Sequence, residues 1–176
     1  PEEDIKRYYD IAMKLDWQDG WYSTPEMKKE AKTPGYKHIH LGGSDTEEID
    51  YEIEQDWVKE IWDEINPGLK LIRHYLNGHG PHQSGGIHVD GWTGNQYTIV
   101  LFLTPDMQPE DGGALELWTP NLSDKMKALA CNTLYTFGSE QEHNQDLLYS
   151  FWPRPGRQVV FDSRIPNMER PVNGDK

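Results

Sequence analysis

Apolar residues recur at helical spacing in the first third of the chain. Between Ile5 and Leu15 they fall every three or four positions, which predicts an amphipathic helix. From Ile49 to Ile65, isoleucine and tryptophan recur at four-residue steps with acidic residues between them, which predicts a second helix. Either residue of Ser44-Asp45 can cap the start of this helix, and the Asn-Pro-Gly sequence that follows it would end it.

The rest of the chain has the pattern of short strands separated by turns. Residues 96–104 form a continuous run of β-branched, aromatic and aliphatic side chains, long enough for a buried strand. Further strands are predicted at residues 36–41, 69–76, 114–119, 132–137, 147–152 and 157–162. The glycine- and proline-rich joints between them indicate a β-sandwich or an open barrel. We therefore predict one α+β, mainly β domain, in which a helical support region (residues 1–66) packs on one sheet of a strand core (residues 67–176).

The amino-acid composition limits which binding partners and which cellular compartment we expect. The chain carries 17 Lys and Arg against 30 Asp and Glu, a net charge of −13, which argues against DNA or RNA because phosphate binding needs a basic face. No stretch approaches the roughly 20 apolar residues of a membrane span, and no signal peptide is visible, so we expect no membrane partner. The single cysteine, Cys131, excludes an internal disulfide and suits a reducing compartment, so we expect a cytoplasmic protein. The sequence indicates no particular oligomeric state.

His88 and Asp90 are the strongest candidates for chemistry. If Gly86–Asp90 is extended, the alternation of side chains places the imidazole and the carboxylate on the same face. Such a pair is two thirds of the triad of two histidines and one carboxylate that holds non-haem Fe(II). A lone His-x-Asp also occurs at ordinary exposed strand ends, so the surrounding motifs have to decide.

Three further motifs follow His-x-Asp in order. They are Asp111-Gly112-Gly113-Ala114-Leu115, then Pro155-Gly156 before a strand that ends in Phe161, and then Asn167 to Lys176 with Pro171-Val172 inside it. Over about residues 70–176, this order resembles the Fe(II)- and 2-oxoglutarate-dependent oxygenases, specifically the prolyl 4-hydroxylase-like branch. The resemblance implies a double-stranded β-helix (jelly-roll) core. It also implies a dioxygenase that uses O2 to hydroxylate a peptide, prolyl residues included, or a small molecule, with release of succinate and CO2.

The resemblance also assigns roles to individual residues. His88 and Asp90 would be catalytic and would be the first two iron ligands. Lys176 would hold the distal carboxylate of 2-oxoglutarate by an ion pair. Tyr75 and Tyr97 would line the co-substrate pocket, although a plain core position explains either tyrosine equally well. The chain stops at Lys176, where members of the family continue into at least one further strand, so we expect a C-terminally truncated barrel.

One departure from the family concerns the third iron ligand, which is a histidine there and Asn167 here. An amide oxygen is a weaker donor to Fe(II) than an imidazole nitrogen. Three explanations stay open: Asn167 is a weak ligand, another histidine (His79, His82 or His143) supplies the nitrogen, or the site is impaired and the protein only binds its ligand. A zinc site built from histidines such as His79 and His82 together with His88 and Asp90 is a weaker alternative, because no known tetrahedral spacing is present.

Overall fold

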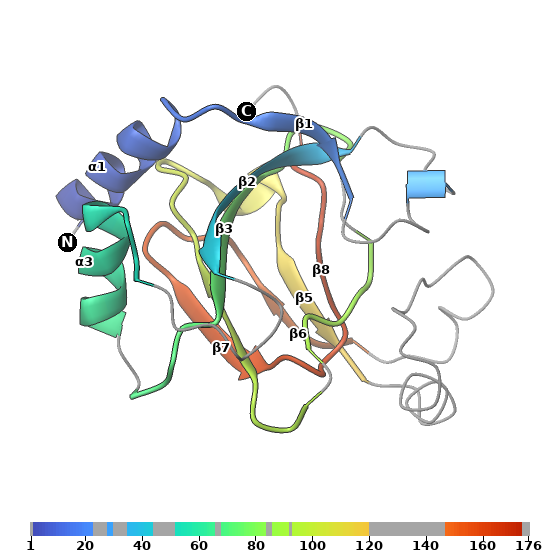
Figure 1. The fold of residues 1–176 in the computed structure, drawn as a ribbon. Helices are drawn as coiled ribbons and strands as arrows, with labels where there is room; N and C mark the ends of the chain where they lie inside the picture. The colour runs from blue at the N-terminus through green and yellow to red at the C-terminus, as the bar shows by residue number, and fades with distance from the viewer. Residues whose placement is uncertain are drawn as a thin grey trace.

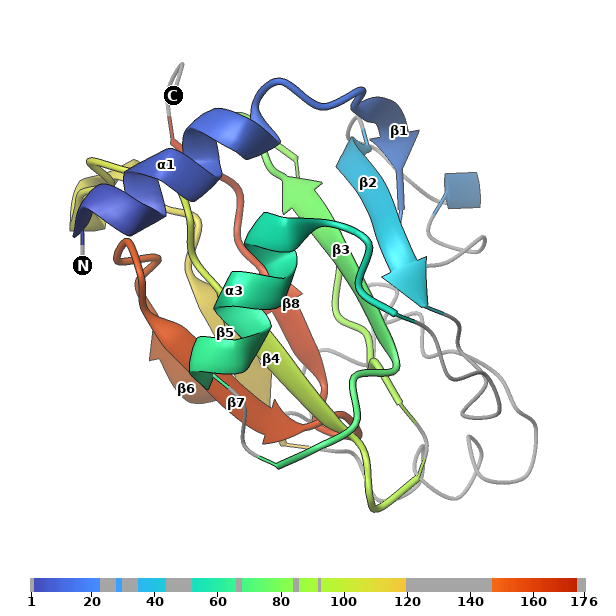
Figure 2. The same ribbon diagram turned by 60° about the vertical axis from the view of Figure 1, so that its left-hand side comes forward.

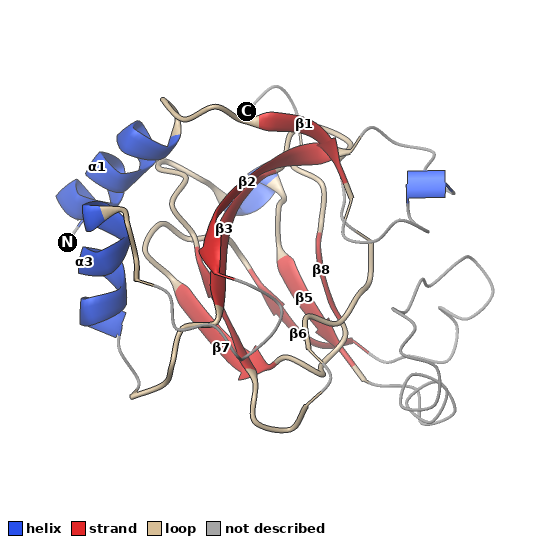
Figure 3. Cartoon of the chain, in the orientation of Figure 1, coloured by secondary structure: helices blue, strands red, loops and turns tan. Residues whose placement is uncertain are grey.

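The computed structural model describes residues 2–22, 28–29, 35–43, 52–65, 68–83, 86–91, 93–119 and 147–173. In these residues the chain is mainly β, with three antiparallel sheets and two longer helices, α1 and α3, beside them (Figure 1, Figure 3). The predicted β-rich fold with N-terminal helices is thereby confirmed. The predicted jelly-roll closure and the single-domain organisation stay predictions. No helix in the described part of the chain is long and apolar enough to cross a membrane.

Helices α1 (Glu2–Ala12) and α3 (Asp56–Ile65) contact each other through polar and aromatic side chains. The Arg7 guanidinium pairs with the Glu60 carboxylate, and the buried Tyr8 hydroxyl donates a hydrogen bond to the same carboxylate at 3.3 Å. The first helix therefore lies where the spacing of apolar residues predicts it. Figure 2 shows both helices beside the pair of strands β4 and β7.

The second helix begins later than its sequence pattern predicts. Residues 52–55 are not helical, and α3 starts at Asp56. The Gln55 side chain is the physical reason: its Nε2 donates to the Leu41 carbonyl, and its Oε1 hydrogen-bonds the His74 ring, each at 3.2 Å. These contacts tie the segment to two strands instead of extending the helix. The predicted capping residues lie outside the part of the chain that is described.

The first sheet has the order β1-β2-β3, formed by β1 (Gln18–Trp21), β2 (Tyr36–Gly43) and β3 (Arg73–Gly78). Strand β2 begins at Tyr36 as predicted and ends later than predicted, at Gly43. Strand β1 is not among the predicted strands, because its four residues are all exposed and show no alternation of apolar and polar side chains. Strand β3 starts and ends later than predicted, because pairing with β2 continues to Gly78, which packs against the Trp17 ring.

The remaining strands form a two-stranded sheet and a three-stranded sheet. Strands β4 (Tyr97–Leu101) and β7 (Gln158–Asp162) pair with each other. The other sheet has the order β6-β5-β8, from β6 (Leu147–Phe151), β5 (Leu115–Trp118) and β8 (Asn167–Glu169). Four of these strands lie within their predicted ranges, whereas β8 was not predicted. A 3-10 turn, η1 (Pro109–Asp111), precedes β5, and the predicted strand at 132–137 lies outside the described residues.

The core lies between the β5 sheet and the β4–β7 pair. Leu115 and Leu117 of β5 pack with Val159 and Phe161 of β7, and all four are buried. Leu117 is also the register partner of Asn167 on β8. The strand that carries the centre of the core therefore also pairs with the strand that carries Asn167.

Truncation of Leu115 tests this arrangement. Leu115 is fully buried, so Leu115→Ala should lower the free energy of unfolding by about 2–5 kcal/mol through lost apolar contacts and a cavity. Leu147, on the neighbouring strand β6, is 47% exposed. Leu147→Ala should therefore lower the free energy of unfolding by only about 0.5 kcal/mol. Urea unfolding measures both. Equal losses in the two variants would contradict a core centred on β5.

Candidate functional site

The segment that carries His88 and Asp90 is held by backbone hydrogen bonds to residues 163–167. His88 N donates to the Asn167 carbonyl at 2.9 Å, and Asn167 N donates to the His88 carbonyl at 2.8 Å. Asp90 N then donates to the Ser163 carbonyl at 3.0 Å. This short antiparallel bridge places the His-x-Asp segment directly beside β8.

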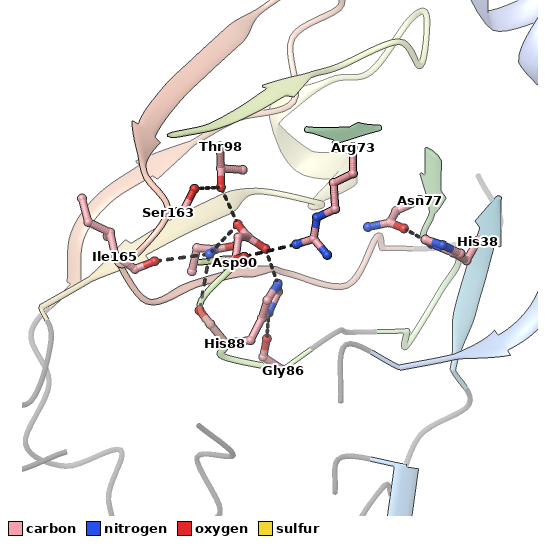
Figure 4. Close-up of polar contacts among 10 residues, drawn as sticks. His38, Arg73, Asn77, Gly86, His88, Asp90, Thr98, Ser163 and Ile165 are labelled. Carbon is pink, nitrogen blue, oxygen red and sulfur yellow. Dashed lines mark hydrogen bonds and ion pairs between the residues drawn. The ribbon is translucent and has the colours of Figure 1, made fainter. Parts of the chain in front are cut away.

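The side chains of His88 and Asp90 point toward each other, as strand alternation predicts. His88 Nε2 lies 3.4 Å from Asp90 Oδ1, and the two side chains are 12% and 10% exposed. On the other side of the ring, His88 Nδ1 hydrogen-bonds the Gly86 carbonyl at 3.0 Å (Figure 4). A cation could contact both the imidazole and the carboxylate from one point.

The second carboxylate oxygen of Asp90 accepts hydrogen bonds from neutral donors. Thr98 Oγ1, on β4, lies 2.9 Å from Oδ2, and Asn167 Nδ2, on β8, lies 3.2 Å from it. Ser163 Oγ in turn lies 2.9 Å from Thr98 Oγ1. Side chains from two strands, β4 and β8, therefore fix the orientation of this carboxylate.

The surroundings of Asn167 determine which end of its amide faces the carboxylate. Its Nδ2 lies 3.3 Å from both the His88 carbonyl and the Ile165 carbonyl, in addition to Asp90 Oδ2. All three neighbours are acceptors, so the NH2 group must face them, because the reversed amide would turn its Oδ1 toward three oxygens. An amide nitrogen offers no lone pair to a cation. In this orientation the side chain of Asn167, which is 2% exposed, donates hydrogen bonds and does not coordinate metal.

Arg73, on β3, connects the first sheet to the site. Its guanidinium donates to the Asp90 carbonyl at 3.2 Å (Figure 4). The same guanidinium lies over the Tyr75 ring, 5.5 Å from the ring centre. Burial is the main cause that raises the pKa of Tyr75 above its usual range, and the Asp90 charge raises it further. The Tyr75 hydroxyl therefore stays protonated and can donate a hydrogen bond.

The two central residues shift each other's pKa in opposite directions. Burial alone would lower the pKa of His88, but the hydrogen bond and charge of Asp90 outweigh it and raise this pKa to about 9. Burial alone would raise the pKa of Asp90, but His88, followed by the Thr98 hydrogen bond, holds it below the usual range. In the metal-free protein the pair is therefore an imidazolium–carboxylate ion pair at neutral pH.

The structure does not bring every predicted site residue to this cluster. Tyr97 is 53% exposed, and its neighbour Thr98 is the β4 residue that faces Asp90. His79 stacks on the Tyr36 ring at 4.5 Å, and His82 is exposed. Within the described ranges, no group of three or more His, Cys, Asp or Glu side chains could hold a metal ion, so these histidines do not complete such a site there. Lys176 and His143 lie outside those ranges.

Sequence reasoning missed Thr98, Ser163 and Arg73 as members of the site. For Thr98 a signal was present, because it is a hydroxyl residue in the otherwise apolar run of β4. A continuous apolar strand does not show which face is inside, however, so Tyr97 and Thr98 could not be told apart. Arg73 and Ser163 are joined to Asp90 through its backbone, and the sequence carries no signal for such contacts.

Comparison with known proteins finds a similarity of fold only. No protein-family model matches the chain, and no curated protein matches it. Among solved structures, the chain is similar to a prolyl-4-hydroxylase from Pseudomonas putida, with a TM-score of 0.56. The match covers 99% of this chain and 82% of that chain, at 14% sequence identity. The chain therefore has a β-rich fold similar to that of a prolyl-4-hydroxylase.

The His88–Asp90 ion pair predicts that the metal-free protein loses stability as pH rises. The folded-state pKa of His88, about 9, lies above its ordinary value of 6.5, so folding favours the protonated form. This stabilisation is fully present below pH 6.5 and is lost as pH rises through about 9. Urea unfolding in the presence of a chelator should show the loss over this window, and His88→Gln should not show it. The same loss in the variant would contradict the assignment to His88.

Proposed function

We propose that the chain is a 2-oxoglutarate- and Fe(II)-dependent dioxygenase. It would hydroxylate a peptide, prolyl residues included, or a small molecule, and would release succinate and CO2. The observation that carries the proposal is the 3.4 Å approach of His88 Nε2 to Asp90 Oδ1 within a fold similar to that of a prolyl-4-hydroxylase. An imidazole nitrogen and a carboxylate oxygen are two of the three protein ligands that non-haem Fe(II) takes in oxygenases of this kind.

The residues present fit Fe(II) at two ligand positions and do not fit it at the third. His88 and Asp90 offer one nitrogen and one oxygen to the same cation. The Gly86 carbonyl holds the Nδ1 proton of His88, so Nε2 is the nitrogen left to face a metal. Asn167 directs its NH2 group at Asp90 and adds no donor atom in this orientation.

The chain's own side chains have two tasks in this proposal, which are to hold the cation and to bind 2-oxoglutarate. Bound Fe(II) and 2-oxoglutarate supply the oxidation of a substrate C–H bond by O2. Asp90 stays ionised, and His88 gives up its Nε2 proton when a cation takes the place of that proton. The protonated Tyr75 hydroxyl can donate a hydrogen bond to a carboxylate of 2-oxoglutarate, and Lys176 is proposed to pair with the distal carboxylate. Tyr97 is left out, because its side chain is exposed on β4.

A second candidate function is ligand binding without turnover. The observation that favours it is the 3.2 Å contact from Asn167 Nδ2 to Asp90 Oδ2, which puts a hydrogen-bond donor where a third metal ligand is expected. In that case His88 and Asp90 remain an internal ion pair. The fold then binds its small molecule or peptide without oxidising it.

Metal and co-substrate titrations distinguish the two candidates. When Fe(II) and 2-oxoglutarate are added without oxygen, the enzyme should develop a visible charge-transfer band; in air it should form succinate above the protein-free background. His88→Ala and Asp90→Ala should each lose both signals, because each removes one of two metal ligands. Asn95→Ala, at an exposed turn, should keep them.

The outcomes are separable. A wild-type protein that gives neither the band nor succinate is not a dioxygenase of this class. Calorimetric binding of 2-oxoglutarate or a proline-containing peptide without succinate would favour the second candidate. Succinate formation that survives Asp90→Ala would contradict the assignment of the site.

A further inference from the structure

The two oxygens of the Asp90 carboxylate have different surroundings. Oδ2 accepts hydrogen bonds from Thr98 at 2.9 Å and from Asn167 at 3.2 Å. Oδ1 faces only the imidazole of His88 among the contacts of this cluster, at 3.4 Å. An oxygen that accepts two hydrogen bonds is fixed in place, and the other oxygen is left to face a cation beside His88.

Asn167 is fixed as firmly as the carboxylate it contacts. Its backbone forms both hydrogen bonds of the bridge to His88, and its side-chain nitrogen faces three acceptors. To coordinate a cation, the amide would have to turn its Oδ1 toward Asp90. That rotation would break all three contacts in a place where only 2% of the residue is exposed and water cannot replace them.

We propose that Asn167 is a positioning residue that acts through Asp90, so that the metal site consists of His88 Nε2 and Asp90 Oδ1 alone. The inference about the metal depends on the function proposed above, whereas the hydrogen-bonding role does not. Thr98 shares this role, because it donates to the same carboxylate oxygen from the opposite sheet. A cation held in this way has one more coordination position open to water than a cation with three protein ligands.

Mn(II), a common substitute for Fe(II), is a suitable probe, because proton relaxation reports the number of water molecules bound to it. If Asn167 positions Asp90, Asn167→Ala should weaken Mn(II) binding by about 10-fold and leave the number of bound waters unchanged. Thr98→Val removes the other donor to Oδ2 and should have the same two effects. Asn167→His should bind Mn(II) more tightly than the wild type, with one bound water fewer.

The matched controls are Asn95→Ala and Thr93→Val, the same two changes at exposed turn positions. Both should bind Mn(II) as the wild type does. One additional bound water in Asn167→Ala, with no effect of Thr98→Val, would show that Asn167 is a ligand and would overturn the proposal. If Asn167→Ala does not fold, Mn(II) binding to Thr98→Val and to the wild type is compared instead. This comparison tests whether a donor to Asp90 Oδ2 is needed to position the carboxylate.

A measurement without metal separates this inference from the proposed function. Asn167→Asp puts a carboxylate where the NH2 group faces Asp90 Oδ2 and two carbonyls, so its metal-free Tm should lie below that of Asn167→Ala. An equal or higher Tm would overturn the hydrogen-bonding role. Absence of Mn(II) binding to the wild type would instead overturn the proposed function and the two-residue metal site, whatever the Tm values are.

Discussion

The antiparallel bridge between His88 and Asn167 is the contact on which the site depends. The segment 86–91 forms no strand of its own, and two backbone hydrogen bonds fix it to β8. Strand β8 pairs in turn with β5, whose Leu115 and Leu117 form the centre of the core. The position of the imidazole is therefore coupled to the packing of the core through one short strand, and a change of register there would move His88 and Asn167 relative to Thr98 on β4.

A buried carboxylate is the second constraint. Asp90 is largely shielded from water in a chain whose net charge is −13, so its charge requires local compensation. His88 supplies a positive charge, Thr98 and Asn167 supply neutral hydrogen bonds, and Arg73 donates to the Asp90 backbone. With these partners the carboxylate stays ionised at neutral pH, which is the state that a cation requires.

The sequence predicts those features that depend on periodicity and leaves out those that depend on tertiary contacts. The spacing of apolar residues locates α1, and the alternation of His88 and Asp90 places both side chains on one face. The start of α3 could not be predicted, because Gln55 hydrogen-bonds two distant strands. Strand β8 has only three residues, too few for a pattern, although it carries Asn167. The composition of β4 does not show which of its two faces is directed at Asp90, because the neighbouring strands determine this.

Asn167 shows how far the identity of a residue determines its role. The order of motifs singles out this position and leaves its function open, because an asparagine side chain can offer either an oxygen or an NH2 group. The arrangement of the surrounding oxygens decides between them: two backbone carbonyls and one carboxylate oxygen lie around the amide, and only its NH2 group can donate hydrogen bonds to them. An asparagine at this position therefore acts as a hydrogen-bond donor that helps to fix the carboxylate of Asp90.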